Sequence, residues 1–360
     1  MRCMFLTVLG ICAASSASAG QMLTDQVFDR YSPMAASDEF SRRVFSPTTF
    51  DRLQRFQVYL GKPAVVHTVD LSHERFDVFV PRVKPSSGYG LLVFVSPIQR
   101  WPLTHDWKKV LDRAGIIYVS AVRSGNSQNV YERRIPLALH AYENITTRYP
   151  IDPSRVTISG FSGGSRTAIR IAAAYADLFT GALLIGGAKT MGEEDFAPPP
   201  KELMTLMQRR MRIVYSTGRH DMPNVRLDGY SMDALRLRCV AGVFKISEAE
   251  ISHEVPNRKV LQRVLNRLEK PLEAKLLSAQ SECATALAAR VDHDVKLAEG
   301  RYADGDKTAA GELLGAADLA WGGLASERLI ALARLIAPGF ENADTNLKNR
   351  PADLGLGSSD

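Results

Sequence analysis

Short apolar runs alternate with stretches of helical periodicity over most of the chain, between about residues 64 and 268. The apolar runs carry few polar positions, which is typical of strands buried on both faces of a parallel sheet. We expect such strands at residues 90–95, 116–122, 156–159, 179–185, 212–216 and 242–247, with helices at residues 107–113, 132–148, 167–175, 202–210 and 228–237. Strands that alternate with helices predict an α/β domain with a mainly parallel sheet and helices on both faces.

Two further strands are expected at the start of this domain, at residues 64–71 and 75–80. Only a short turn separates them, so they should pair antiparallel and form one edge of the sheet.

The same pattern divides the rest of the chain. Residues 20–63 are polar and mixed, with two short helical patterns, and we interpret them as an N-terminal arm before the α/β domain of residues 64–270. Residues 271–340 show alanine and leucine at helical spacing and no strand signal. They predict a helical extension packed on the α/β domain, since they hold too few units for a free-standing repeat array. Residues 341–360 are polar and should form a flexible tail.

The first nineteen residues have the features of a signal peptide. Arg2 precedes an apolar core at residues 4–14, which is too short to span a bilayer, and Ala-Ser-Ala at residues 17–19 fits the small-x-small cleavage rule. We therefore expect an exported protein, either periplasmic or secreted. Cys239 and Cys283 lie beyond this segment, and an even pair in an oxidising compartment is consistent with a disulfide. The alternative is two unrelated buried thiols.

Composition narrows the function classes. The net charge of +6 is spread along 360 residues without the lysine and arginine block that marks a nucleic-acid surface. Beyond the leader, no apolar run is long enough to cross a membrane. There is no Cys-x-x-Cys and no His/Cys cluster, so we predict neither a metal nor another cofactor. The oligomeric state stays open.

A Gly-x-Ser-x-Gly sequence stands between a predicted strand and a predicted helix. Its residues are Gly160, Phe161, Ser162, Gly163 and Gly164. This motif forms the sharp strand-to-helix turn that exposes a nucleophilic serine, and the two outer glycines let the strand and helix pass closely. A glycine-rich loop of no chemical role is the alternative. The context favours Ser162 as a nucleophile.

An acid and a histidine follow in the chain order that such a serine requires. Asp221 ends the segment of residues 217–221 that directly follows the strand expected at residues 212–216, and His253 comes after the last strand. We predict that His253 is the general base and that Asp221 orients it. His220 is a rival base, and the alternative acids are Glu254 and Asp233.

The oxyanion needs two N–H donors. One should be the amide of Gly163, the residue after the nucleophile. The other should come from the loop after residues 90–95, where Pro97 has no N–H and Ile98 is the best candidate. Trp101 and Trp107 follow this loop and are candidates for a substrate pocket, although aromatic residues there are as often simple packing.

Residues 151–156 (Ile-Asp-Pro-Ser-Arg-Val), the Gly-Phe-Ser-Gly-Gly turn and residues 175–181 (Tyr-Ala-Asp-Leu-Phe-Thr-Gly) together resemble secreted polyhydroxybutyrate depolymerases and feruloyl-esterase-like α/β-hydrolases. The resemblance covers about residues 64–268 and implies an exported serine esterase with the α/β-hydrolase fold. Three positions depart from the family pattern: alanine replaces a proline at residue 176, Ser96-Pro97 stands where the family usually has His-Gly, and His253 follows serine instead of glycine.

The sequence therefore predicts a cofactor-independent hydrolase that cleaves small-molecule or polymer carboxylic esters through an acyl-serine intermediate. A peptidase of the same fold is the second enzymatic reading. The alternative from another class is a non-catalytic binding protein that keeps the fold and binds partners through its helical extension.

Overall fold

The computed structural model describes residues 20–60, 69–193, 195–247 and 250–338. These residues form an eight-stranded sheet in the order β1-β2-β4-β3-β5-β6-β7-β8. The strands are β1 Gln21–Gln26, β2 Phe76–Val80, β3 Tyr89–Val95, β4 Ile116–Ala121, β5 Ile151–Phe161, β6 Gly181–Ile185, β7 Arg212–Tyr215 and β8 Val243–Lys245. All neighbours from β4 to β8 pair in parallel, and β2 pairs antiparallel with both β1 and β4.

The antiparallel edge differs from the prediction. The partner of β2 at the sheet edge is β1, within the segment that the sequence predicts as an arm, and Gln21 pairs with Val80. The strand expected at residues 64–71 lies mostly outside the described residues, and where it is described, Leu71 begins a short 3-10 helix, Leu71–His73. β1 escapes a search for apolar alternation because its sequence, Gln-Met-Leu-Thr-Asp-Gln, is largely polar, as an exposed edge permits.

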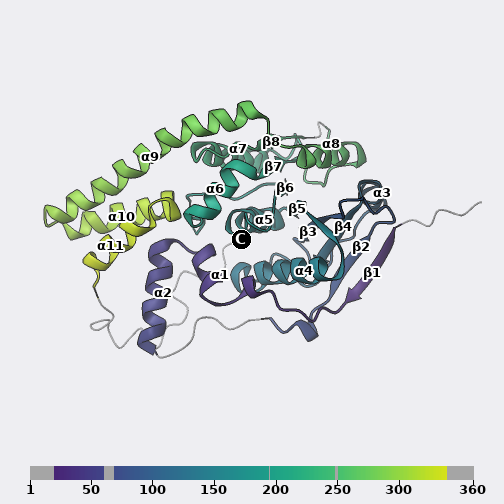
Figure 1. Cartoon of the computed structure of the whole chain (residues 1–360), viewed down its shortest axis with the longest axis horizontal. Helices are drawn as coiled ribbons and strands as arrows, with labels where there is room; N and C mark the ends of the chain where they lie inside the picture. Colours follow the sequence, from purple (N-terminus) through teal and green to yellow (C-terminus); the bar gives the residue numbers. More distant parts are fainter. Residues whose placement is uncertain (1–19, 61–68, 194, 248–249, 339–360) are drawn as a thin grey trace, which may run out of the picture.

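Helices cover both faces of the sheet (Figure 1). They are α1 Ser37–Val44, α2 Pro47–Leu60, α3 His105–Ala114, α4 Ile135–Arg148, α5 Gly163–Ala174, α6 Lys201–Arg210, α7 Met222–Leu237, α8 Arg258–Glu269, α9 Ala274–Ala303, α10 Lys307–Trp321 and α11 Ser326–Ile336. Alternate residues of β3 enter different cores, as a pleated strand requires: Leu92 packs with α3 and α8, whereas Leu91 and Val93 pack with α4 to α7.

The predicted α/β-hydrolase fold is confirmed. A mostly parallel eight-stranded sheet, an antiparallel second strand and helices on both faces carry the chain to a serine turn after β5. In this arrangement the carboxyl ends of β3 to β8 meet at one edge of the sheet, where loops from distant parts of the sequence come together.

The predicted helical extension is present as α9, α10 and α11, which share an apolar core containing Val295, Ala298 and Leu329. It lies beyond α6 and next to α2 in Figure 1. A disulfide joins Cys239, after α7, to Cys283 on α9, with 5.7 Å between the two Cα atoms. Within the described ranges, no helix combines the length and apolar character needed to cross a membrane.

Candidate active site

Ser162 stands at a strained turn between β5 and α5. Its backbone has φ 55° and ψ −124°, a conformation that a residue with a side chain rarely adopts. The turn is crowded because the strand and helix almost touch: a Cβ on Gly160 would lie 2.2 Å from the carbonyl oxygen of Gly164, and one on Gly164 would lie 2.0 Å from that of Val95. The Ser162 N–H donates to the Ile185 carbonyl at 2.8 Å, which fixes the turn to the end of β6.

The strain at Ser162 gives a first prediction. Ser162→Gly should unfold with a free energy about 1 kcal/mol higher than that of Ser162→Ala, because glycine adopts this conformation freely, although it also gains entropy in the unfolded chain. Urea denaturation of the two variants measures the difference. Equal stabilities would mean that the backbone at this position stores no strain.

His253 and Asp221 meet at the same edge of the sheet. His253 Nδ1 lies 2.6 Å from Asp221 Oδ2. The Asp221 side chain is 7% exposed, and both its oxygens also accept from Nδ2 of Asn224, at 2.9 and 3.0 Å. The carboxylate is therefore held on two sides, and the imidazole is held by the carboxylate.

The imidazole lies against the serine turn. The rings of His253 and Phe161 are 4.6 Å apart between centroids, and Phe161 directly precedes Ser162. Gly186, which follows the strand that holds the serine amide, lies beside both rings: a Cβ there would approach Phe161 Cε2 to 2.9 Å and His253 Cε1 to 3.0 Å. The Ser162 hydroxyl forms no hydrogen bond with His253 or with any other described residue. The serine and histidine are thus neighbours through Phe161, without a direct bond.

A buried carboxyl group supports the loop after β6 beside this site. Asp228 on α7 accepts from the Ala188 N–H at 3.0 Å and from the Thr217 hydroxyl at 2.5 Å, and Thr217 in turn accepts from the Gly186 N–H at 3.0 Å. Burial raises the pKa of Asp228 to about 7.

This pKa predicts a pH dependence of stability. Between the unfolded value of 3.8 and about 7, the folded state binds the proton more tightly than the unfolded chain, so the contribution of Asp228 to stability is lost as pH rises through this range. Asp228→Asn removes this titration while keeping an acceptor for Ala188. Relative to wild type, the variant should gain on the order of 4 kcal/mol in unfolding free energy between pH 4 and pH 8.

Urea denaturation at both pH values tests this expectation. Asp233→Asn is the matched control, because Asp233 lies on the same helix with its side chain 77% exposed. A difference between Asp228→Asn and wild type that does not change with pH would contradict the prediction.

The structure separates the two predicted oxyanion donors. Gly163 opens α5, where the first N–H groups of a helix have no partner within the helix. The Ile98 N–H, in contrast, donates to the Ser96 hydroxyl at 3.1 Å, and that hydroxyl donates to the Ile98 carbonyl at 2.7 Å. Ser96 therefore satisfies both backbone groups of Ile98, which argues against Ile98 as an oxyanion donor.

The two predicted pocket tryptophans also differ. Trp107 is 2% exposed, and its Nε1 donates to the Pro256 carbonyl at 3.0 Å, so its ring belongs to the core between α3 and the sheet. Trp101 is half-buried, and its ring lies 5.5 Å from that of Phe161. Of the two tryptophans, Trp101 is therefore the one whose ring packs on Phe161, which in turn packs on His253.

Two residues of the candidate site, Asn224 and Arg134, were not predicted from the sequence. Asn224 could have been suspected from its place three residues after Asp221 at the start of a helix. Arg134 gave no signal, because an arginine in a helix is usually solvated. It is 3% exposed and lies beneath the loops that end β3 and β4, and burial lowers its pKa to about 10.

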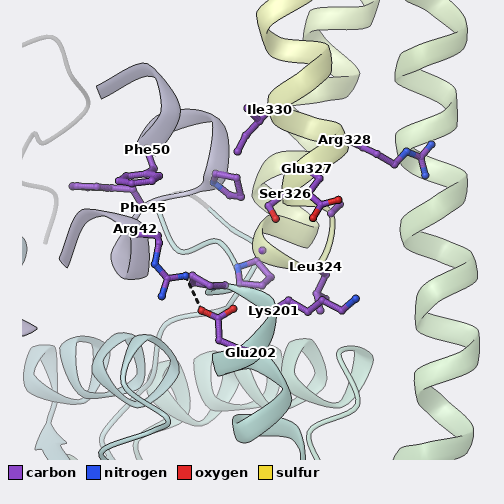
Figure 2. Close-up of a pocket in the computed structure, with 15 residues that line it drawn as sticks. Arg42, Phe45, Phe50, Lys201, Glu202, Leu324, Ser326, Glu327, Arg328 and Ile330 are labelled. Atoms are coloured by element: carbon purple, nitrogen blue, oxygen red, sulfur yellow. Dashed lines mark hydrogen bonds and ion pairs between the residues drawn. The ribbon is translucent and has the colours of Figure 1, made fainter. Parts of the chain in front are cut away.

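Two cavities of about 470 Å³ each lie apart from Ser162. One, shown in Figure 2, separates the junction of α1 and α2 from the start of α6 and from α11. Phe45 and Phe50 line it on one side and Ile330 on another, with an Arg42–Glu202 ion pair at its base. The other adjoins the start of α3. In the described ranges, no three His, Cys, Asp or Glu side chains gather closely enough to hold a metal ion.

Comparison with known proteins gives no family. No family model matches the sequence, and no curated protein matches it. Among solved structures, similarity is found to a thermostable esterase (14% identity, TM-score 0.39, 58% of this chain and 59% of the esterase) and to S-formylglutathione hydrolase (FrmB) from Staphylococcus aureus (12% identity, TM-score 0.41, 55% of this chain and 93% of the hydrolase).

A third similar structure is substrate-bound FphF, a fluorophosphonate-binding serine hydrolase of Staphylococcus aureus (11% identity, TM-score 0.45, 70% of this chain and 100% of FphF). This chain spans 59% of the length of the thermostable esterase. At such identities and TM-scores, we do not assign the activities of these proteins to the chain.

Proposed function

We propose that this chain is a serine hydrolase that cleaves carboxylic esters through an acyl-serine intermediate, using Ser162, His253 and Asp221. The observation that carries the proposal is the 2.6 Å contact between His253 and Asp221, with the imidazole packed on the residue that precedes a strained serine. Three loops that are distant in sequence supply these side chains, an arrangement that core packing alone does not require.

The chemistry follows from the roles. Ser162 Oγ attacks the ester carbonyl carbon while His253 Nε2 takes the hydroxyl proton, and the carbonyl oxygen becomes an oxyanion. Collapse of this intermediate expels the alcohol, which receives the proton from His253. A water molecule then attacks the acyl-serine while His253 takes a proton from it. The bond between the acyl carbon and Ser162 Oγ breaks, His253 returns the proton to Oγ, and the carboxylic acid leaves. Asp221 holds the imidazole tautomer with Nε2 free and stabilises the imidazolium.

Ser162 and His253 share no hydrogen bond in the structure, as noted above, and the proposal requires one during the reaction. Catalytic hydrogen bonds commonly tighten only when the substrate is in place. The ester class is supported by the sequence resemblance to polyhydroxybutyrate depolymerase and feruloyl-esterase-like hydrolases. The signal-peptide features of residues 1–19, which lie outside the described residues, support export to the periplasm or beyond.

A fluorophosphonate probe tests the proposal, because it phosphonylates only an activated serine. We expect covalent labelling of the wild type and none of Ser162→Ala, together with hydrolysis of a short-chain nitrophenyl ester by the wild type alone. A peptidase would label equally and would also cleave the ester, but it would hydrolyse peptide amides as well, which we do not expect of this chain. Absence of labelling in a folded wild type would leave a non-catalytic binding protein as the explanation.

A further inference from the structure

The loops after β3 and β4 are bonded to each other at the carboxyl edge of the sheet. The Arg123 N–H donates to the Gln99 carbonyl at 2.6 Å, and the Asn126 N–H donates to the Pro97 carbonyl at 3.0 Å. Gly125 packs so closely that a Cβ there would lie 3.0 Å from the Ile98 carbonyl carbon. The two loops therefore move as one unit, and this unit presents the Asn126 side chain.

The Asn126 amide lies directly on the residue that follows Ser162. A Cβ placed on Gly163 would lie 2.2 Å from Asn126 Oδ1, 2.6 Å from Cγ and 2.8 Å from Nδ2. The absence of a side chain at Gly163 is thus what admits the amide. An ester carbonyl attached to Ser162 Oγ would direct its oxygen towards the Gly163 N–H, next to this amide group.

Arg134 determines which way the amide points. Its Nη2 donates to Asn126 Oδ1 at 3.3 Å, and because a guanidinium can only donate, the oxygen must face it and Nδ2 must face away. The same Nη2 also donates to the Ser96 carbonyl oxygen at 3.0 Å, while Nε donates to that of Ser124 at 2.9 Å and Nη1 to that of Gly163 at 3.3 Å. The guanidinium therefore ties the two loops to the start of α5.

Two groups in this arrangement lack the partner that their chemistry calls for: a hydrogen-bond donor lacks an acceptor, and a buried cation lacks a carboxylate. Within the described residues, the exposed Asn126 side chain has no acceptor for Nδ2, and the Arg134 guanidinium donates only to carbonyl and amide oxygens, with no carboxylate partner. A free donor and an uncompensated buried cation thus lie beside Gly163, where an oxyanion would form. The Ile98 N–H cannot fill this place while it donates to Ser96.

We propose that Asn126 Nδ2, and not the Ile98 N–H, is the second oxyanion donor beside the Gly163 amide, and that Arg134 is the positioning residue that orients Asn126. The proposal rests on the proposed function. In the tetrahedral intermediate the negative oxygen accepts from both donors, and the nearby Arg134 charge stabilises it further in a site of low dielectric constant. No bond to either residue is made or broken, so the steps of the reaction are unchanged.

The test compares Asn126→Ala and Asn126→Asp with wild type and Ser162→Ala on a nitrophenyl ester. Aspartate keeps an acceptor for Arg134 but has no N–H. Both variants should lose about 10²- to 10³-fold in kcat with KM changed less than about 3-fold, because the donor acts on charge that develops in the transition state. Affinity for a trifluoromethyl ketone, whose serine adduct carries an oxyanion, should fall by a similar factor. Gln128→Ala, in the same loop, is the matched control.

Arg134→Lys adds a test of positioning. It should lower kcat and ketone affinity together, and its effect should shrink when Asn126 is already alanine, because the two residues act through one donor. Wild-type activity that disappears in Ser162→Ala but survives within 3-fold in both Asn126 variants would overturn this inference and leave the proposed function intact. A wild type no more active than Ser162→Ala would overturn both.

Discussion

His253→Ala is expected to lower kcat for a nitrophenyl ester by about 10⁵- to 10⁶-fold, the largest effect of a single substitution outside Ser162. Without the imidazole, the serine hydroxyl has no base to take its proton during attack, and the leaving alcohol has no acid to protonate it. Because Ser162 and His253 act as one unit, the double variant Ser162→Ala/His253→Ala should be no slower than either single variant.

His220→Ala separates His253 from its nearest rival. His220 lies next to Asp221 in sequence, but its side chain is exposed. Its backbone N–H donates to the Ile251 carbonyl at 3.2 Å. We expect this variant to keep activity within about 2-fold of wild type. If His220→Ala were as slow as His253→Ala, or if the losses of the double variant simply multiplied, the assignment of His253 as base would be wrong.

The fold was predictable where burial dictates sequence. Strands β3, β4, β6 and β7 and the second half of β5 are largely buried, and their sequences are mostly apolar. Their places, and with them the ends of the strands that precede Ser162 and Asp221, therefore follow from the pattern. β1 could not be predicted from the hydrophobic pattern, because an exposed edge strand needs no alternation of apolar and polar residues. The pattern predicts a helix from residue 228, whereas α7 begins at Met222, and Pro223 in its first turn is the sequence feature that indicates the earlier start.

Some residues of the candidate site could likewise be predicted from the sequence, and others could not. Chain order and strand ends sufficed to choose Asp221 and His253, which the structure brings within 2.6 Å of each other. The hydrogen bonding of the loop after β3 could not be predicted from the sequence. A hydroxyl two residues before a backbone N–H can accept a hydrogen bond from it, as the Ser96 hydroxyl does from the Ile98 N–H. Arg134 could not have been found from sequence, since its partners are carbonyl oxygens of two loops and of the first residue of α5, and their meeting depends on the whole fold.

The helical extension is attached by contacts that lie beside the sheet. Its disulfide ends on Cys239, and Arg334 of α11 pairs with Asp51 of α2 at 2.5 Å. These attachments lie on α2 and on the turn after α7, and the side chains around Ser162 take no part in them. The proposed reaction at Ser162 therefore does not depend on these attachments of the extension.

Asp221→Asn is expected to lower kcat by about 10⁴-fold at neutral pH. An asparagine amide that donates to His253 Nδ1 forces the proton onto Nε2, the nitrogen that must accept from Ser162, and it also removes the charge that stabilises the imidazolium. Asn224→Ala should have a smaller effect in the same direction, because Asn224 Nδ2, which also lies 3.2 Å from His253 Nδ1, donates to both oxygens of the carboxylate but carries no negative charge to stabilise the imidazolium.

Rates for these variants on one nitrophenyl ester, with folding checked by urea denaturation, decide the role of Asp221. Asp233→Asn is the control, since Asp233 was the alternative acid and its side chain is 77% exposed. It should leave kcat within about 2-fold of wild type. An Asp221→Asn enzyme that stays folded and keeps more than about a tenth of wild-type kcat would show that the 2.6 Å contact is structural and that another group orients His253. A 10⁴-fold loss with KM unchanged would instead mean that the carboxylate acts on the transition state, as an orienting acid must.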